Sequence, residues 1–304
     1  MVAMVGNSGR YGFGEAHQRL RATNTSLLVL VTATHSEIAG SEGGTSSTPV
    51  AVGISGTVEE VGQDIRDFYQ QGDKVLGYLS SDAMLSTEHQ SCSVLLDSEM
   101  VCPKPQRLST DIGARLPLAF IRAAYILIHG LGLGIVEGTD PATSGPQANR
   151  REDTIVLSSI LVTGGETPAG AMVAKILHQT LPLLKVFLTC EGANECILVS
   201  RTLHLVTNLG ATYAIDAQAG DLLDHLQASS RQYCGSEGMD TIVDLTGLAS
   251  QRSELKTLLK GPKLFLDCTS SNVETNRMHL VELRVQAMSA LSQLLLKEGV
   301  NGIE

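Results

Sequence analysis

Residues 160–170, ILVTGGETPAG, constrain the fold more than any other stretch of this 304-residue chain. An apolar run typical of a buried strand leads into a glycine-rich turn, and a helical pattern follows directly. Glycine permits a tight turn and a close backbone approach to a pyrophosphate, while the helix N-terminus offers N–H groups to the phosphates. The turn predicts dinucleotide binding by Gly164, Gly165, Thr167 (as a hydroxyl donor) and Gly170; the alternative is a purely structural turn.

Strand and helix patterns alternate through most of the C-terminal half. Repeated βα units predict a parallel sheet, and with the glycine turn they indicate a Rossmann nucleotide-binding domain over residues 110–275. The expected strands are 155–163, 185–190, 212–215, 239–244 and 263–268, and the expected helices are 110–131, 171–179, 194–209, 221–227 and 253–259.

The N-terminal part has a different pattern, with closely spaced short strands separated by turn residues. Such a pattern predicts a small β-barrel-like domain over residues 1–109, whose first 25 residues are irregular. A long apolar helix is expected at 280–298, and residues 276–304 are expected to pack back onto this smaller domain. The fold class is therefore α/β, a doubly wound parallel sheet plus a smaller β domain.

The end of the second parallel strand usually contacts the adenosine ribose. Cys190 lines the adenosine pocket by position, and the neighbouring Glu191 would hydrogen-bond a ribose 2′-OH and repel a 2′-phosphate. Ser200 and Arg201, in the helix expected next, would instead hold a 2′-phosphate, unless Arg201 is a solvated helix residue. These residues leave the choice between NADPH and NADH open.

Overall composition excludes some partners. The formal net charge of −10 argues against a nucleic-acid or anionic-membrane partner. The six cysteines show no C-x-x-C spacing and no secretory signal precedes them, which predicts reduced thiols in a cytoplasmic protein. The longest apolar runs are too short or too interrupted to span a bilayer.

Several segments, in this order, resemble the medium-chain dehydrogenase/reductase superfamily. Residues 56–78 match its G-x-V-x-x-V-G…GD-x-V segment, and residues 92–105 match the strand pair that follows. The segments LSTDIGARLPLAF, ILVTGGETPAG, LGATYAID and MDTIVDLTG resemble successive parts of its nucleotide domain. The resemblance implies a GroES-like β-barrel domain beside the Rossmann domain. Within the superfamily, the turn is most similar to zinc-free fungal trans-acting enoyl reductases and ToxD-like proteins.

This resemblance implies an NADPH-dependent, zinc-independent reductase of the enoyl or quinone type. Its substrate would be a small or carrier-bound polyketide-like molecule, with a polyketide synthase as a possible partner in secondary metabolism. By resemblance, Asp244 ends the strand beside the nicotinamide. Tyr125 and His35 are candidate proton donors, although Tyr125 also suits a packed helix residue. Arg122 fits either a phosphate or substrate pocket or an exposed surface.

A catalytic zinc site is not expected. Residues 51–53 are Ala-Val-Gly where zinc-dependent members have Gly-His-Glu, and a lone His35 cannot form a three-ligand site.

The chain also departs from the family pattern. The first domain starts late, the chain stops soon after the last expected helix, and residues 191–208 differ from the usual cofactor-binding segment. We therefore expect a shortened member of the superfamily. The alternative is a non-redox protein on the same fold, either a cyclase or isomerase or a synthase partner, which would work without a nicotinamide.

Overall fold

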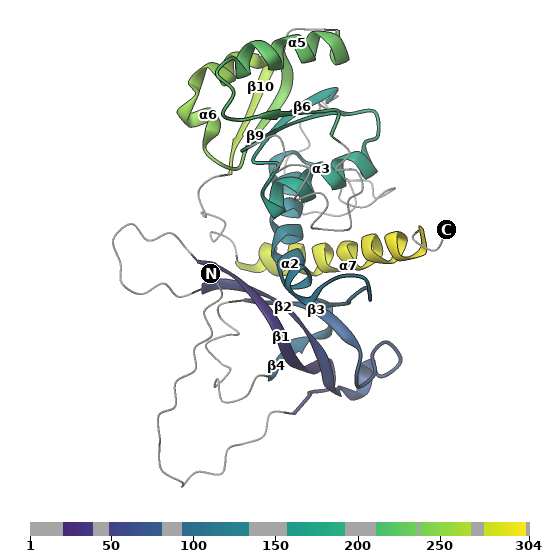
Figure 1. Cartoon of the computed structure of the whole chain (residues 1–304). Coiled ribbons are helices and arrows are strands. Elements are labelled where there is room, and N and C mark those ends of the chain that lie inside the picture. Colours follow the sequence, from purple (N-terminus) through teal and green to yellow (C-terminus); the bar gives the residue numbers. More distant parts are fainter. Residues whose placement is uncertain are drawn as a thin grey trace.

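The computed structural model describes residues 21–38, 49–80, 93–133, 157–191, 211–235, 238–268 and 277–301. Within these residues the chain forms one antiparallel and one parallel sheet, with a helix running between them (Figure 1). This arrangement confirms the α/β fold class.

The antiparallel sheet has the strand order β4-β1-β2-β3-β5. Its two long strands pair along most of their length, and the pairing sets His35 of β1 opposite Gly53 of β2. Apolar side chains on one face form a core that includes Leu27, Ile54 and Leu96. The strands are β1 (Ser26–Ile38), β2 (Pro49–Val61), β3 (Lys74–Ser80), β4 (Ser93–Asp97) and β5 (Val101–Pro103), with short 3-10 turns η1 (Gln63–Ile65) and η2 (Ser98–Met100).

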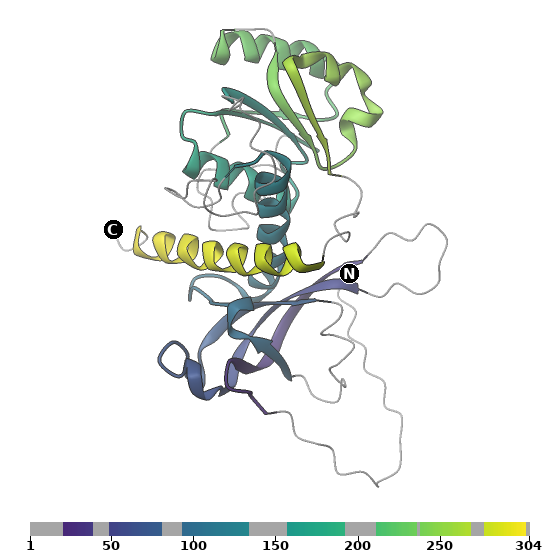
Figure 2. The ribbon, with the colours of Figure 1, turned by 180° about the vertical axis from the view of Figure 1, so that it is seen from behind.

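The parallel sheet has the order β10-β9-β6-β7-β8 and carries helices on both faces (Figures 1 and 2). Every residue of its central strand β6 is buried, as expected where both faces of a sheet are covered. The strands are β6 (Ser159–Thr163), β7 (Lys185–Cys190), β8 (Tyr213–Asp216), β9 (Met239–Asp244) and β10 (Leu259–Asp267). The helices are α3 (Pro168–Thr180), α5 (Leu222–Cys234), α6 (Leu248–Gln251) and the 3-10 helix η4 (Ser253–Leu258).

Two of the expected helices need comment. The helix expected over 194–209 lies outside the described residues. The helix expected over 253–259 is present as the 3-10 helix η4 and ends one residue earlier, because Leu259 already belongs to β10. Leu255 and Leu258 are buried three residues apart, a spacing that a 3-10 turn also satisfies.

Helix α2 (Thr110–Tyr125), continued by the π-helical turn η3 (Ile126–Gly130), joins the two sheets. It contacts β1, β2 and β3 on one side and α3 on the other. It lies directly on β2, since a Cβ at Gly53 would be 2.0 Å from the Ala114 carbonyl oxygen. The stretch Thr110–Gly130 is long and apolar enough to cross a membrane, yet 56% of its most apolar window is buried inside the fold, as in a core helix.

Helix α7 (Arg277–Asn301) crosses between the two sheets and packs on α2, β5 and η2 (Figure 2). It buries Leu283, Ala287 and Leu291, and the Arg284 guanidinium lies 5.1 Å from the centre of the Tyr78 ring. Through β5 and η2 the helix contacts the antiparallel-sheet part of the chain. The largest buried cluster therefore contains residues of both sheets together with α2, α3 and α7.

The expectation that all cysteines are reduced thiols is wrong for one of them. Cys190 is disulfide-bonded. Cys102, Cys234 and Cys268 are free.

Candidate functional site

Backbone hydrogen bonds fix the conformation of the glycine turn between β6 and α3. Gly164 has φ +74°, the left-handed region that favours glycine, and a Cβ there would be 2.5 Å from Thr246 Cγ2. The Gly165 N–H donates to the Thr189 carbonyl at 2.8 Å, and the Thr167 N–H donates to the Gly164 carbonyl at 2.9 Å. The turn is thus fixed to the neighbouring strand β7.

Thr167 is the N-cap of α3. Its hydroxyl accepts from the Gly170 N–H at 3.0 Å and donates to the Gly164 carbonyl at 2.7 Å. The hydroxyl proton expected to reach a phosphate is therefore already used inside the turn. Gly170 fits for a steric reason: a Cβ there would lie 2.2 Å from the Gly164 carbonyl oxygen.

These bonds determine which amides remain for a ligand. Pro168 has no N–H, and the amides of Gly165, Thr167 and Gly170 are all hydrogen-bonded within the protein. Within the described ranges, the Ala169 N–H has no hydrogen-bond partner. The N-terminus of α3 thus offers this amide, together with the positive end of the helix dipole, to an anion.

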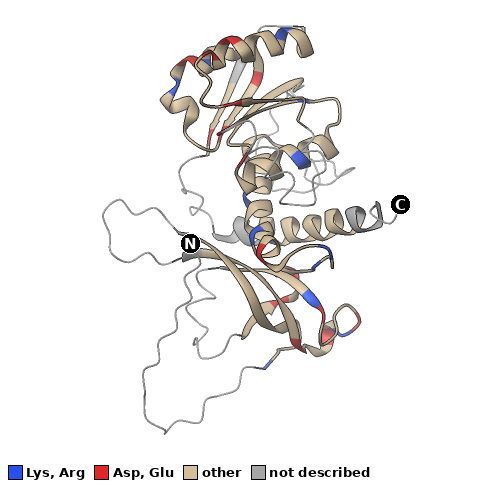
Figure 3. Cartoon of the chain, viewed as in Figure 1, with Lys and Arg blue, Asp and Glu red and all other residues tan. Residues whose placement is uncertain are grey.

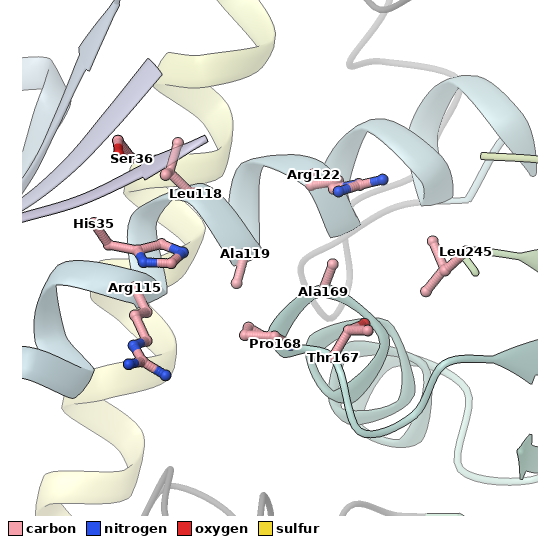
Figure 4. A pocket seen from close by; sticks show the side chains of 10 residues that line it. All are labelled: His35, Ser36, Arg115, Leu118, Ala119, Arg122, Thr167, Pro168, Ala169 and Leu245. Carbon is pink, nitrogen blue, oxygen red and sulfur yellow. The ribbon is translucent and has the colours of Figure 1, made fainter. Parts of the chain in front are cut away.

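A pocket of about 150 Å³ opens in front of this helix N-terminus, between the two sheets (Figure 4). Strand β1, helix α2, the glycine turn and the segment after β9 each contribute to it. The lining residues are His35, Ser36, Arg115, Leu118, Ala119, Arg122, Thr167, Pro168, Ala169 and Leu245. Segments distant in sequence therefore meet at the carboxyl end of the parallel strands, where ligands of doubly wound sheets bind.

The two predicted proton donors are placed differently. His35 lines the pocket, whereas Tyr125 is not among its lining residues. Tyr125 packs against the largest core cluster, and its ring centre lies 5.2 Å from that of His129. The alternative of a packed helix tyrosine is therefore the one that the contacts favour.

Asp244 is completely buried at the end of β9. Its carboxylate accepts from the Thr163 hydroxyl at 2.7 Å, the Gly247 N–H at 2.9 Å and the Ala249 N–H at 3.0 Å. These bonds hold the turn after β9 beside the glycine turn. The contacts thus make Asp244 a support of the site rather than a direct ligand contact.

The remaining predicted cofactor residues lie at the end of β7 or beyond it. Cys190 is fully buried, and a Cβ added at Gly165 would be 3.1 Å from its sulfur, so it packs behind the turn. Glu191 is exposed, and its N–H donates to the Glu166 carboxylate at 3.3 Å. Ser200 and Arg201 lie outside the described residues.

Two arginines enter the pocket from α2. Arg122 donates from Nη2 to the Cys268 carbonyl at 3.1 Å, which ties α2 to the end of β10. Burial raises the pKa of the Cys268 thiol to about 11 despite the opposing effect of Arg122, so this thiol is neutral at pH 7. Sequence reasoning overlooked Arg115, although its seven-residue spacing from Arg122 places both on one helix face.

The described residues contain no group of three His, Cys, Asp or Glu side chains arranged to hold a metal ion. In residues 51–53, compared above with a Gly-His-Glu motif, Val52 stands at the histidine position and is buried in the core of the antiparallel sheet.

No protein-family model and no curated protein sequence matches the chain. Solved structures do match. A putative zinc-dependent alcohol dehydrogenase from Rhizobium etli has a TM-score of 0.57 at 17% identity, covering 93% of this chain and 80% of its own. The CurK enoyl reductase has a TM-score of 0.51 at 16% identity, covering 94% and 81%.

A mycobacterial protein complexed with NADPH has a TM-score of 0.52 at 14% identity, covering 95% of this chain and 84% of its own. Quinone oxidoreductases from mycobacteria and from Pseudomonas syringae are also among the matches. At these identities the likeness concerns the fold. The chain therefore has the fold of the medium-chain dehydrogenases/reductases, a Rossmann domain beside a GroES-like domain.

Proposed function

We propose that the chain is a zinc-independent reductase of the enoyl or quinone type that takes its hydride from NADPH. The observation that carries this proposal is the pocket between the sheets, which brings His35 of β1 to the same cavity as the glycine turn and the N-terminus of α3. The fold supports a nicotinamide cofactor, because one structure with this fold was solved with NADPH.

The residues present fit such a cofactor. A Cβ at Gly170 would fill the turn, and the Ala169 amide and the Arg122 guanidinium face a space that a phosphate group can occupy. Leu118 and Leu245 add apolar walls, which favour the flat nicotinamide and exclude water. When bound, NADPH supplies a hydride; the protein's own residues hold it and manage the proton.

Reduction of a conjugated double bond needs a hydride at the β-carbon and a proton at the α-carbon. His35 is the lining side chain able to deliver that proton, since imidazole exchanges protons near neutral pH. Its position on a strand of the long β1–β2 pair gives it a rigid support. Tyr125 is set aside because it does not line the pocket.

We also propose the finer assignment that the resemblance implies. The protein would work in the cytoplasm beside a polyketide synthase, as a zinc-free trans-acting enoyl reductase would, on a carrier-bound polyketide-like substrate. Comparing crotonyl groups on an acyl carrier protein with crotonyl-N-acetylcysteamine tests this assignment. Equal kcat/KM for the two would remove the carrier from the proposal.

The main test measures NADPH binding by isothermal titration and NADPH oxidation at 340 nm with crotonyl-N-acetylcysteamine and with 1,4-naphthoquinone. We expect binding, turnover of at least one of the two, and a loss of about 10²–10⁴-fold in kcat for His35→Ala. His178→Ala, which removes an exposed histidine of α3 outside the pocket, is the matched control. Absence of binding by both NADPH and NADH at millimolar concentration would refute the proposal, and turnover without nicotinamide would select the non-redox alternative.

A further inference from the structure

The pocket between the sheets is basic in an acidic protein. Its charged or titratable lining side chains are Arg115, Arg122 and His35, and no carboxylate of the described residues lines it, although the whole chain has a net charge of −10. Figure 3 marks Lys and Arg positions in blue on the ribbon of α2 where it passes between the sheets. A cavity of this kind favours an anionic ligand.

Arg115 differs from Arg122 in its contacts. The Arg122 guanidinium is held by the Cys268 carbonyl. Arg115 makes no hydrogen bond or ion pair with any part of the chain that the structure describes. An arginine that lines a cavity and lacks a protein partner has its full set of N–H donors available to a ligand.

The two arginines also face different ends of the pocket. They are seven residues apart on α2, which is about 10 Å along the helix axis. In Figure 4, Arg115 lies on the same side of the pocket as His35, while Arg122 lies towards Leu245 and the glycine turn. Arg122 therefore adjoins the cofactor end, and Arg115 adjoins the proton donor, where a substrate would bind.

We propose that the pocket selects substrates that carry an anionic oxygen group, a carboxylate or a phosphate, and that Arg115 binds this group. This inference rests on the proposed function and names its substrate class. A planar guanidinium pairs with either group through two parallel hydrogen bonds, which lysine cannot reproduce. Arg115 is exposed to solvent and shares the cavity with the apolar side chains of Leu118, Ala119 and Pro168.

The test uses unreactive ligands that differ by one anionic group, so that binding is measured apart from turnover. The first pair is 4-oxopentanoate and its methyl ester, and the second is 4′-phosphopantetheine and pantetheine. Titration calorimetry compares wild type, Arg115→Gln and Arg66→Gln in the presence of saturating NADP⁺. Arg66 is an exposed arginine of the antiparallel-sheet domain outside the pocket, so its replacement is a control for lost charge.

We expect wild type and Arg66→Gln to bind the anionic member of at least one pair at least about tenfold more tightly than the neutral member. In Arg115→Gln this preference should fall to about threefold or less. The pair that shows the preference tells whether the source is a carboxylate or a phosphate.

Equal binding of acid and neutral forms by wild type, or an undiminished preference in Arg115→Gln, would overturn the inference. The same proteins are assayed for NADPH oxidation with (E)-4-oxopent-2-enoate and its methyl ester. If wild type reduces neither compound yet keeps its anion preference in the titrations, the anion site stands and the reductase assignment to these enones fails. The two failures are thereby distinguished.

Discussion

Replacement of Gly170 by alanine tests the glycine turn with the smallest possible change. The added Cβ would lie 2.2 Å from the Gly164 carbonyl oxygen and 2.9 Å from its carbon, so the turn must move by nearly 1 Å. Neither contact is with a flexible side chain, which places the cost at the upper end of the usual overpacking range, about 3 kcal/mol. The better helix propensity of alanine offsets up to about 1 kcal/mol.

For a chain of 304 residues that unfolds in one transition, the net loss of about 2 kcal/mol corresponds to a fall in Tm of roughly 3 °C. Because the Ala169 amide moves with the turn, NADPH affinity should fall at least about tenfold. Gly220→Ala is the control, since nothing lies within 4 Å of a Cβ there, and its stability change should stay within about 0.5 kcal/mol. Thermal unfolding without ligand and calorimetric titration measure the two effects. A Gly170→Ala protein that melts and binds like wild type would refute the steric argument; one that melts earlier but binds normally would make the turn purely structural.

Three further predictions concern residues around the site. Asp244→Ala leaves three donors without their acceptor in a fully buried position, so the free energy of unfolding should drop by at least about 3 kcal/mol; an unchanged urea midpoint would contradict the network. Thr167→Val removes the N-cap of α3 and should cost about 0.5–2 kcal/mol in the same assay, with Thr167→Ser retaining most of the stability. At Asp240, burial alone would raise the pKa, but hydrogen bonds from Ser158 and Ser159 outweigh it and lower the pKa. The resulting stability is present above the ordinary aspartate pKa of about 3.9 and is lost as the pH falls through the lower pKa of the folded protein. Asp240→Asn should remove this acid-dependent component of stability from urea unfolding curves recorded between about pH 2 and 6. An unaltered pH dependence of the urea midpoint in this variant would contradict the prediction.

Much of the fold is predictable from sequence because its signals are local. Short apolar runs mark β6 and β7, and the repeated βα order implies a parallel sheet without knowledge of any contact. The helix expected over 253–259 is a 3-10 helix, a type that the sequence does not specify because apolar spacing does not distinguish one turn of α-helix from a 3-10 helix.

The site was less predictable because its members are brought together by tertiary packing. His35 and Arg115 share a pocket only because α2 lies directly on β2, which depends on the missing side chain at Gly53. The Thr167 hydroxyl donates to the Gly164 carbonyl instead of a ligand because the turn brings these two residues together. Neither relation leaves a local pattern in the sequence.

The core that α2 shares with both sheets determines how the molecule unfolds. Tyr78 and Cys102 of the antiparallel sheet belong to the same buried cluster as Val162 and Leu188 of the parallel sheet. Unfolding of either sheet would expose apolar surface of the other sheet to water. Unfolding of one sheet alone is therefore unfavourable. We therefore expect a single cooperative transition in calorimetry and no long-lived half-molecule during limited proteolysis. The buried cluster at the boundary between the two sheets stabilises both of them. Any opening of the pocket must therefore leave the packing of this cluster intact.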